Sequence, residues 1–412
     1  MEEPTTDTRT PRILKPFVSL GFREYRLLWA TQVGVSSAMW TEQIARNWLT
    51  YQMTGSALQL GLVNLMRGVP IMAIGLWGGV LSDRFDKRRL LLVIHAWSVV
   101  VYAVMGVVIL SGHLALWHLY VSTFALAIGP AMDAPLRTST IPSVVPPEHL
   151  LNALTLNGIA INGTRLLLPA AVGVMLGITS PGWAYLTLAV IYLLNEWVVI
   201  RLRLPPVPKR TGRGSMLGDL QAGIAFVRGK GMVLALMISA IGVQGIGFSH
   251  RALIPVFAAE KLGMGSGTYG FLMSADGLGA VIGGLLLASI GIRRHTGLFM
   301  LAFMAINGAA IIALGWAPWL VLATVAVMLI GGSSTAVRAT NNTLLLTNTP
   351  EELRGRVMAF KTFNEGISAI GMVLMGALAD ATDVTLALSV VGTTALLLLA
   401  ASVLRKPQLA SL

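Results

Sequence analysis

The sequence predicts an all-α polytopic membrane protein in which twelve transmembrane helices form two pseudo-symmetric bundles of six. Composition is the first reason: 55% of the 412 residues are apolar, only 12% are charged, and the mean hydropathy is +0.74. Soluble globular domains are far more polar than this. Apolar runs also recur along the whole chain, and a spanning helix needs about 20 such residues. Finally, short sequence patterns recur half a chain apart, which indicates a duplicated bundle.

Apolar runs define the twelve predicted helices. Their approximate spans are 25–52, 57–81, 90–111, 117–143, 151–178, 183–203, 232–258, 268–291, 297–315, 319–345, 355–379 and 384–404. The fourth, fifth and tenth predicted helices are the most polar. They are predicted from their place between neighbouring spans more than from their composition. We expect the tryptophans near predicted helix ends to anchor at the membrane interface; these are Trp48, Trp117, Trp183, Trp316 and Trp319.

The distribution of basic residues predicts the orientation of these helices. The segment from Gly79 to Arg89 reads GVLSDRFDKRR, and its charges place it in a short loop at a membrane surface. Basic residues in short loops stay on the cytoplasmic side. Loops assigned to that side hold most of the basic residues, whereas the opposite loops hold one, Lys261. We therefore expect a multi-pass plasma membrane protein with both termini in the cytoplasm and no cleaved signal.

The chain divides into five predicted segments. Residues 1–21 form a cytoplasmic tail, 22–203 the N-terminal six-helix bundle, 204–231 a cytoplasmic linker, 232–404 the C-terminal six-helix bundle, and 405–412 a second cytoplasmic tail. The linker opens with prolines and basic residues and then places apolar residues on one helix face, as in amphipathic helices at a membrane interface; these residues are Leu217, Leu220, Ile224 and Val227.

Traces of an internal repeat relate the two halves. PEHL at residues 147–150 precedes the fifth predicted helix, and PEEL at 350–353 precedes the eleventh, 203 residues later. GVML at 173–176 and GALA at 376–379 have the same spacing. Transporters built from two related bundles show such repeats and bind their substrates near the bilayer midplane between the bundles.

Charged residues inside the predicted spans are functional candidates, because burying a charge mid-membrane costs roughly 3 kcal/mol or more. They are Glu42, Arg46, Arg67, Asp133, Arg137, Arg165, Glu196, His250, Arg251, Asp276, Arg338, Lys361 and Glu365. Three pairs are spaced i,i+4 and share a helix face, at positions 42/46, 133/137 and 361/365. One such pair can simply neutralise itself, but the whole set indicates a polar path through the membrane.

Depth in the membrane assigns roles to these candidates. The expected substrate-binding residues are Glu42, Gln43, Arg46, Arg67, Asn157 and Arg165. The expected proton carriers are Asp133, Asp276 and Glu365. Asp276 has no charged neighbour in its own helix, so we expect it to become neutral most easily. The expected gating residues are Gly79, Asp83, Arg84, Lys87, Arg88 and Arg137, with a latch between Asp83 and Arg137.

Missing motifs exclude several classes of function. No G-x-x-x-x-G-K-[ST] phosphate loop is present, so we expect the proton gradient, not ATP or a bound cofactor, to supply energy. The six histidines are scattered and show no metal-ligand spacing, and the chain has no cysteine. Its net charge of +12 lies in loops between apolar runs, which argues against nucleic acid. We expect a monomer in the lipid bilayer that binds a small-molecule substrate and is not an enzyme.

The sequence resembles the major facilitator superfamily. Residues 79–88 follow its loop motif G-x-x-x-D-[RK]-x-G-[RK]-[RK], with Asp86 in place of the usual glycine. FREYRLLW at 22–29, TGSALQLGLV at 54–63 and ALTLN at 153–157 resemble the branch of drug:proton antiporters that includes macrolide exporters and the enterobactin exporter. The resemblance implies alternating access and proton-coupled efflux of a small amphipathic molecule, such as a drug, a siderophore or another metabolite.

Two questions stay open at this stage. The many arginines in the membrane favour an anionic or zwitterionic substrate over a cationic one. An importer or a lipid flippase would use the same scaffold, and so would a membrane sensor that transports nothing. The sequence does not separate these from an exporter.

Overall fold

A computed structural model of the chain describes residues 12–84, 86–204, 225–290, 296–350, 353–354, 357 and 363–405. These residues form twelve long helical segments, and no strand occurs among them. Nine of the segments are long and apolar enough to cross a membrane, and Gly366–Ala381 is a shorter apolar helix. The all-α polytopic fold class is therefore confirmed.

Six helices and two short 3-10 segments make up the first half, which we call the N-terminal bundle. In chain order they are η1 (Arg12–Gly21), α1 (Arg23–Thr54), α2 (Ala57–Arg84), α3 (Lys87–Leu110), α4 (Leu116–Val144), η2 (Pro147–His149), α5 (Leu150–Ile178) and α6 (Pro181–Ile200). Neither α1 nor α4 contains a described stretch that counts among the nine apolar spans. Each contains a buried charge pair, Glu42 with Arg46 and Asp133 with Arg137.

The second half, which we call the C-terminal bundle, begins with an irregular run. It comprises α8 (Gly231–Ala240), η3 (Ile241–Ile246), η4 (Gly247–Ser249), α9 (His250–Val256) and η5 (Phe257–Lys261), followed by α10 (Ser266–Ile290), α11 (Thr296–Gly315), α12 (Leu320–Thr347), α14 (Phe363–Ala381) and α15 (Val384–Arg405). Pro255 lies inside α9 and lacks the N–H that would donate to the preceding turn. The π-helical turns η3 and η5 flank this proline.

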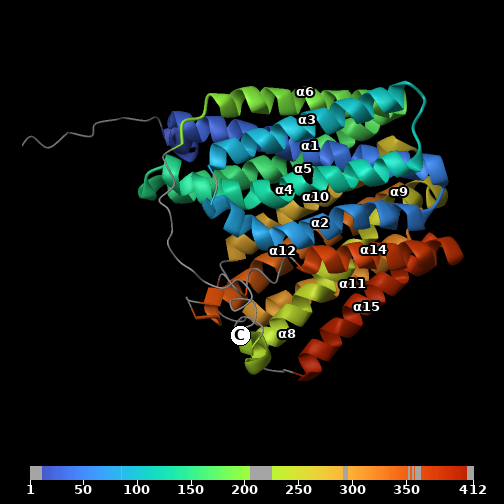
Figure 1. The fold of residues 1–412 in the computed structure, drawn as a ribbon. Helices are drawn as coiled ribbons and strands as arrows, with labels where there is room; N and C mark the ends of the chain where they lie inside the picture. The colour runs from blue at the N-terminus through green and yellow to red at the C-terminus, as the bar shows by residue number, and fades with distance from the viewer. Residues whose placement is uncertain are drawn as a thin grey trace, which may run out of the picture.

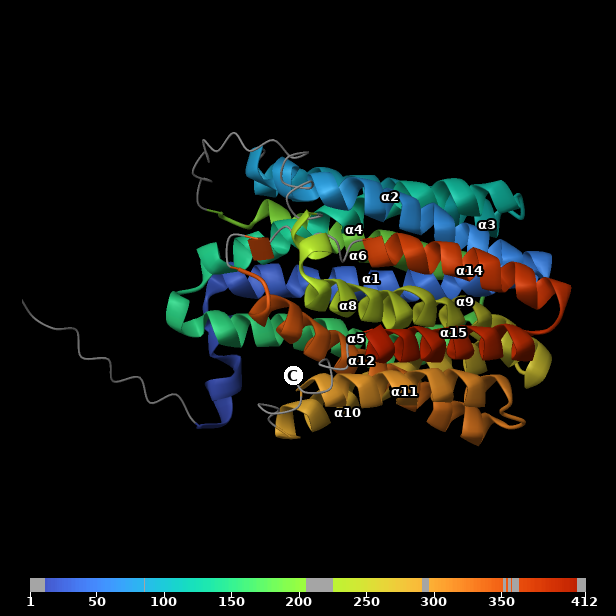
Figure 2. The ribbon, with the colours of Figure 1, turned by 90° about the horizontal axis from the view of Figure 1, so that it is seen from below.

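The long helices lie side by side along one axis, so the molecule has two ends (Figures 1 and 2). At the end that we call the short-loop end, the turns at 55–56, 111–115, 179–180, 262–265, 316–319 and 382–383 join consecutive helices. The opposite end, here called the basic end, carries Arg23, Lys87, Arg201 and Arg354. Toward the basic end, α8 and α15 slope away from the N-terminal bundle (Figure 1).

Local sequence sets the helix boundaries. Gly55 ends α1 in the left-handed conformation, with φ of 61°, which glycine adopts without steric cost. Asp86 precedes α3 and accepts a 2.9 Å hydrogen bond from the amide of Arg89, so it caps the helix. This cap explains an aspartate where related loops usually have glycine.

Glycines bring the two bundles into backbone contact near the short-loop end. A Cβ on Gly61 of α2 would lie 2.6 Å from the carbonyl oxygen of Met372 on α14. In the same way, a Cβ on Gly270 of α10 would lie 2.2 Å from the carbonyl oxygen of Pro169 on α5. Both distances are too short for any other residue, so the contacts between α2 and α14 and between α5 and α10 require glycine.

The two contacts are equivalent in the repeat. Pro169 and Met372 are 203 residues apart, as are Gly173 and Gly376. A Cβ on Gly173 would meet the carbonyl oxygen of Ser266, the first residue of α10, and one on Gly376 would meet that of Ala57, the first residue of α2. The spacing found in the sequence is therefore repeated in the packing between the bundles.

Asp380 strengthens one of these contacts. This residue lies near the end of α14, and its carboxylate accepts hydrogen bonds from the amides of Ala57 at 2.7 Å and Leu58 at 3.1 Å, as well as from the Ser56 hydroxyl. A carboxylate of the C-terminal bundle thus caps the N-terminus of α2, where it also meets the positive end of the helix dipole.

Most of the predicted spans agree with the observed helices to within a few residues. The eleventh was expected over 355–379, and its described helix begins at Phe363. Most of the predicted amphipathic helix of the linker lies outside the described residues. One tryptophan prediction was wrong: Trp48 is not an interface anchor, because it is 7% exposed and stacks on Tyr269 of the C-terminal bundle.

Adding a single methyl group at Gly270 should test the backbone contact between α5 and α10. We expect Gly270→Ala to push α5 and α10 apart at the short-loop end, because the new Cβ meets backbone that cannot move aside. The chain has no cysteine, so spin labels at His113→Cys and Thr382→Cys report the distance between the bundles there. The matched control is Gly267→Ala on the same helix, which meets nothing within 4 Å. Equal distance distributions for both variants would contradict the packing described.

Candidate functional site

The first group of buried charges, here called the Glu42 cluster, connects α1 and α2. One carboxylate oxygen of Glu42 accepts a 2.6 Å hydrogen bond from Arg46, and the other accepts one of 3.1 Å from Arg67. Glu42 is 4% exposed and Arg46 only 1% exposed. Arg46 also donates to the side chain of Asn64, at 3.2 Å. The pairing of residues 42 and 46 predicted from their spacing is therefore confirmed.

A hydrogen-bond chain continues from this cluster into the C-terminal bundle. Asn64 donates to the side chain of Asn47 at 3.2 Å, and Asn47 donates to the hydroxyl of Tyr269 at 3.3 Å. Tyr269 lies on α10 and Asn47 on α1, so this contact crosses between the bundles. Closer to the turns, the hydroxyl of Tyr51 donates to Glu260 at 3.2 Å.

The second group, here called the Asp276 cluster, lies at the interface itself. Asp276 of α10 accepts a 2.6 Å hydrogen bond from Arg165 of α5 and one of 3.0 Å from Arg251 of α9. The ring of Trp40, on α1, lies 5.8 Å from the guanidinium carbon of Arg165 and 6.0 Å from that of Arg251. Four helices from both bundles thus meet around one carboxylate.

Backbone packing fixes the position of Asp276. A Cβ on Gly331 of α12 would lie 2.0 Å from the backbone oxygen of Asp276, so α12 contacts α10 directly behind this residue. On the other side, a Cβ on Gly277 would lie 2.7 Å from the carbonyl oxygen of Arg165. Because α10 is held between α5 and α12, the carboxylate and its arginine partner have little freedom to separate within this conformation.

The third group, here called the Asp133 cluster, lies within the N-terminal bundle. Arg137 donates to Asp133 on the same helix at 2.5 Å, and also to Thr31 of α1 at 2.7 Å. Nε2 of His95, on α3, is 3.8 Å from the other oxygen of Asp133. All of these charged groups are buried, and His95 is fully so. The expected i,i+4 pairing of residues 133 and 137 is confirmed.

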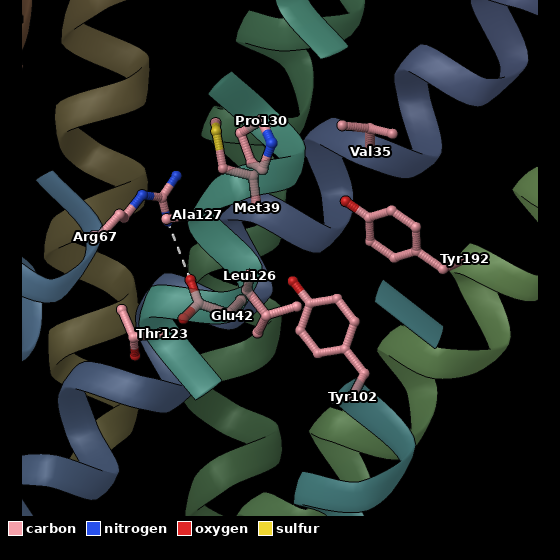
Figure 3. Close-up of a pocket in the computed structure, with 10 residues that line it drawn as sticks. All are labelled: Val35, Met39, Glu42, Arg67, Tyr102, Thr123, Leu126, Ala127, Pro130 and Tyr192. Atoms are coloured by element: carbon pink, nitrogen blue, oxygen red, sulfur yellow. Dashed lines mark hydrogen bonds and ion pairs between the residues drawn. The ribbon is translucent and has the colours of Figure 1, made fainter. Parts of the chain in front are cut away.

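A small cavity of about 40 Å³ lies beside Glu42 and Arg67 of the Glu42 cluster (Figure 3). Its lining includes Glu42, Arg67, Tyr102, Thr123 and Tyr192. Figure 3 shows Glu42 and Arg67 paired at this space, with Tyr102 and Tyr192 reaching toward it from α3 and α6. A cavity of this size holds about one or two water molecules.

Tyr192 has a second contact that extends this path. Its ring meets His95 edge to face, with centroids 5.5 Å apart. Through the small cavity and these contacts, the titratable groups follow one another as Glu42, Tyr192, His95 and Asp133. Sequence reasoning missed His95 and Tyr192, although a histidine in the middle of the apolar run LLLVIHAW was a signal that could have identified the first.

The structure gathers part of the predicted set of substrate-binding residues. Glu42, Arg46 and Arg67 lie together, and Arg165 lies with the Asp276 cluster. Gln43 and Asn157 are half-buried and belong to neither cluster. Arg251, which had been assigned to no role, is a direct partner of Asp276. Asp276 was expected to become neutral easily because its own helix holds no charged neighbour. This expectation was wrong, since two arginines from other helices contact its carboxylate.

The predicted gating residues are only partly visible. The side chains of Asp83 and Arg84 lie outside the described part of the chain, as do the surroundings of Gly79 and the side chain of the predicted proton carrier Glu365. The latch expected between Asp83 and Arg137 therefore stays a prediction. Lys87 donates to the backbone of Ser139 at 3.0 Å, and Arg88 donates to that of Val199 at 3.2 Å, so both connect helices of the N-terminal bundle.

Comparison with known families identifies the class of protein. Residues 14–411 match the family described as transmembrane secretion effectors, a branch of the major facilitator superfamily. The chain belongs to this family. Its members are membrane transporters and not enzymes. The chain is therefore a multi-pass secondary transporter for a small-molecule substrate.

Two relatives of this major facilitator transporter have names that include a siderophore. The staphyloferrin A transporter of Staphylococcus aureus is 25% identical over 86% of this chain and 89% of its own length. The enterobactin exporter EntS of Escherichia coli is 27% identical over 79% of this chain and 78% of its own.

Solved structures support the fold. A POT family transporter in complex with 5-aminolevulinic acid superposes with a TM-score of 0.76 at 12% identity, covering 94% of this chain and 96% of its own. A bacterial homologue of the human lysosomal transporter Spinster superposes with a TM-score of 0.74 at 14% identity, covering 94% of this chain and 97% of its own. At this level of identity the likeness shows the fold, and the site has to be judged from its own residues.

Removing the central carboxylate of the Glu42 cluster should destabilise the transporter. We expect Glu42→Gln to cost about 3–5 kcal/mol of unfolding free energy, because it leaves the buried Arg46 with an uncompensated charge. Denaturant unfolding of the purified protein in detergent measures this. Glu260→Gln is the matched control, since Glu260 is exposed and its change should stay within about 1 kcal/mol. A Glu42→Gln protein as stable as the control would show that the cluster is not held by charge pairing.

Proposed function

We propose that this transporter exports a small anionic or zwitterionic molecule of the siderophore class from the cytoplasm, powered by the proton gradient. The observation that carries the proposal is a surplus of buried positive charge. The Glu42 and Asp276 clusters together hold four guanidinium groups, of Arg46, Arg67, Arg165 and Arg251, and two carboxylates. Within the described residues their formal charge is +2, and a surplus of this kind inside a membrane protein is offset most readily by an anionic ligand.

The names of the relatives support the same substrate class. One is named as a transporter and the other as an exporter of a siderophore. Siderophores bind ferric iron through oxygen anions, which are the groups that guanidinium pairs bind best. The name of the enterobactin relative supports the direction of transport.

The contacts between the bundles support alternating access. The cross-bundle contacts described above run from the Asp276 cluster in the middle to Asp380 at the short-loop end. The basic end carries the charges that stay in the cytoplasm. We therefore propose that both termini are cytoplasmic, in the cell inner membrane. The conformation described is then closed to the outside, and one chain acts as a monomer with a complete path.

A carboxylate can be the proton carrier of an exchanger only if protonating it does not favour binding of the anionic substrate. A proton on Glu42 or Asp276 would release guanidinium groups to an anionic substrate, so proton and substrate would bind there together. Exchange of substrate for protons needs a carboxylate that does not share the substrate's arginines. Asp133 meets this requirement, because its partner Arg137 lies inside the N-terminal bundle and also binds α1, which carries Glu42. His95 and Tyr192 supply the proton path between the small cavity and Asp133.

Flux measurements with purified protein in liposomes test the proposal. We expect an outward gradient of enterobactin or staphyloferrin A to drive protons in the opposite direction, seen with an entrapped pH-sensitive dye. Asp133→Asn should reduce this proton flux to the level of empty liposomes, because the amide cannot take up a proton. Asp383→Asn is the control, since Asp383 lies in an exposed turn and an asparagine can keep its cap on α15.

Two results would contradict the function. Transport of lipophilic cations such as tetraphenylphosphonium, without transport of either siderophore, would rule out an anionic substrate. Siderophore movement that is only inward in cells, and that stops when the proton gradient collapses, would make the protein an importer.

A further inference from the structure

Asp276 uses only part of its hydrogen-bonding capacity. Both arginines bind the same carboxylate oxygen, Oδ2, with Nη2 of Arg165 at 2.6 Å and Nη2 of Arg251 at 3.0 Å. The other oxygen, Oδ1, is buried and accepts no hydrogen bond from the described residues. Most buried polar atoms have a hydrogen-bond partner, so Oδ1 keeps the capacity to accept a hydrogen bond.

The surroundings of this carboxylate have the composition of an anion-binding site. Among the described residues, two guanidinium groups bind this one carboxylate, in a region where Arg165 is 6% and Arg251 9% exposed. The face of Trp40 lies beside both guanidinium groups. The indole N–H of Trp40 is also buried without a hydrogen-bond partner among the described residues. A planar anion would find two cations, a ring face and a free donor together.

We propose that Asp276 is an internal stand-in for the substrate, and that a planar group with adjacent anionic oxygens displaces it from Arg165 and Arg251. A carboxylate on an aromatic ring and an ionised catechol both have this chemistry. The planar part stacks on Trp40, and the oxygens take the guanidinium N–H groups that Asp276 holds in the empty protein. This inference rests on the proposed export of an anion and names the residues that receive it.

Displacement has a consequence for the bundles. Arg165 belongs to α5 of the N-terminal bundle and Asp276 to α10 of the C-terminal bundle, so their ion pair connects the two. A substrate anion that takes Arg165 removes this connection. The empty protein therefore stays closed at the short-loop end, and binding of the substrate permits that end to open.

Ligand binding to the purified full-length protein tests the proposal. The probe is 2-naphthoate, a planar carboxylate, and the neutral comparison is 2-naphthamide, which has the same shape. We expect Asp276→Asn to bind 2-naphthoate at least about tenfold more tightly than the unchanged protein, since a charged competitor for the guanidinium groups is gone. Binding of 2-naphthamide should not change.

Asp383→Asn is the control, because it also replaces an aspartate by asparagine, but in an exposed turn where the new side chain can keep the cap on α15. Its affinity for 2-naphthoate should equal that of the unchanged protein. Equal or weaker binding of 2-naphthoate by Asp276→Asn would overturn the proposal. A second variant, Arg165→Gln, should lose at least about tenfold in affinity for 2-naphthoate and keep that for 2-naphthamide. Unchanged 2-naphthoate binding in this variant would overturn the proposal as well.

A comparison of 2-naphthoate with catechol at high pH and with citrate separates the chemical sources of the anion. Stronger binding of 2-naphthoate or catechol than of citrate supports stacking on Trp40, and stronger binding of citrate contradicts it. The outcome is also distinct from that of the transport assay. Siderophore export without any effect of Asp276→Asn on 2-naphthoate binding would leave the proposed function standing and refute the stand-in role. Tighter binding of 2-naphthoate by Asp276→Asn without export of any anion would support the stand-in role and refute the proposed function.

Discussion

The ion pair between Arg165 and Asp276 is the interaction on which the arrangement of the two bundles depends. A charge in the middle of a membrane needs a partner, because neither lipid nor apolar side chains solvate it. Here Asp276 of the C-terminal bundle pairs with Arg165 of the N-terminal bundle as well as with Arg251 of its own bundle, so the charge of Arg165 is balanced across the interface. The stability of the closed interface and the binding of an anion are therefore linked, since both depend on the same guanidinium group.

Backbone contact at glycines makes this pairing possible. Helices in a membrane lack a hydrophobic force that would bring them together, so they associate through close packing and polar contacts. Gly61 and Gly270 occupy equivalent positions in the repeat and bring α2 to α14 and α10 to α5. The charged contacts are not symmetric: Asp380 caps α2, whereas Ser266 donates to the backbone of Gly173 at the equivalent place. The packing is therefore shared by the two halves, whereas the polar contacts beside it differ.

The fold and the local pairs could be predicted because they depend on short-range pattern. Apolar spans gave the helices, and the i,i+4 spacing gave the pairs Glu42 with Arg46 and Asp133 with Arg137. Contacts between helices far apart in sequence could not be predicted in this way. Asp276 has no charged neighbour in its own helix, because its partners Arg165 and Arg251 come from two other helices. Trp48 was predicted to be an interface anchor because it is near a helix end, and its contact with Tyr269 of a distant helix could not be foreseen.

The most direct test of this account is the distance between the bundles at the basic end. Spin labels at Leu151→Cys on α5 and Leu404→Cys on α15 occupy exposed positions there, in a chain without other cysteines. A transported anion at saturating concentration should shorten this distance, because displacement of Asp276 lets the short-loop end open and the basic end close. An unchanged distance distribution with that same anion bound would contradict the account.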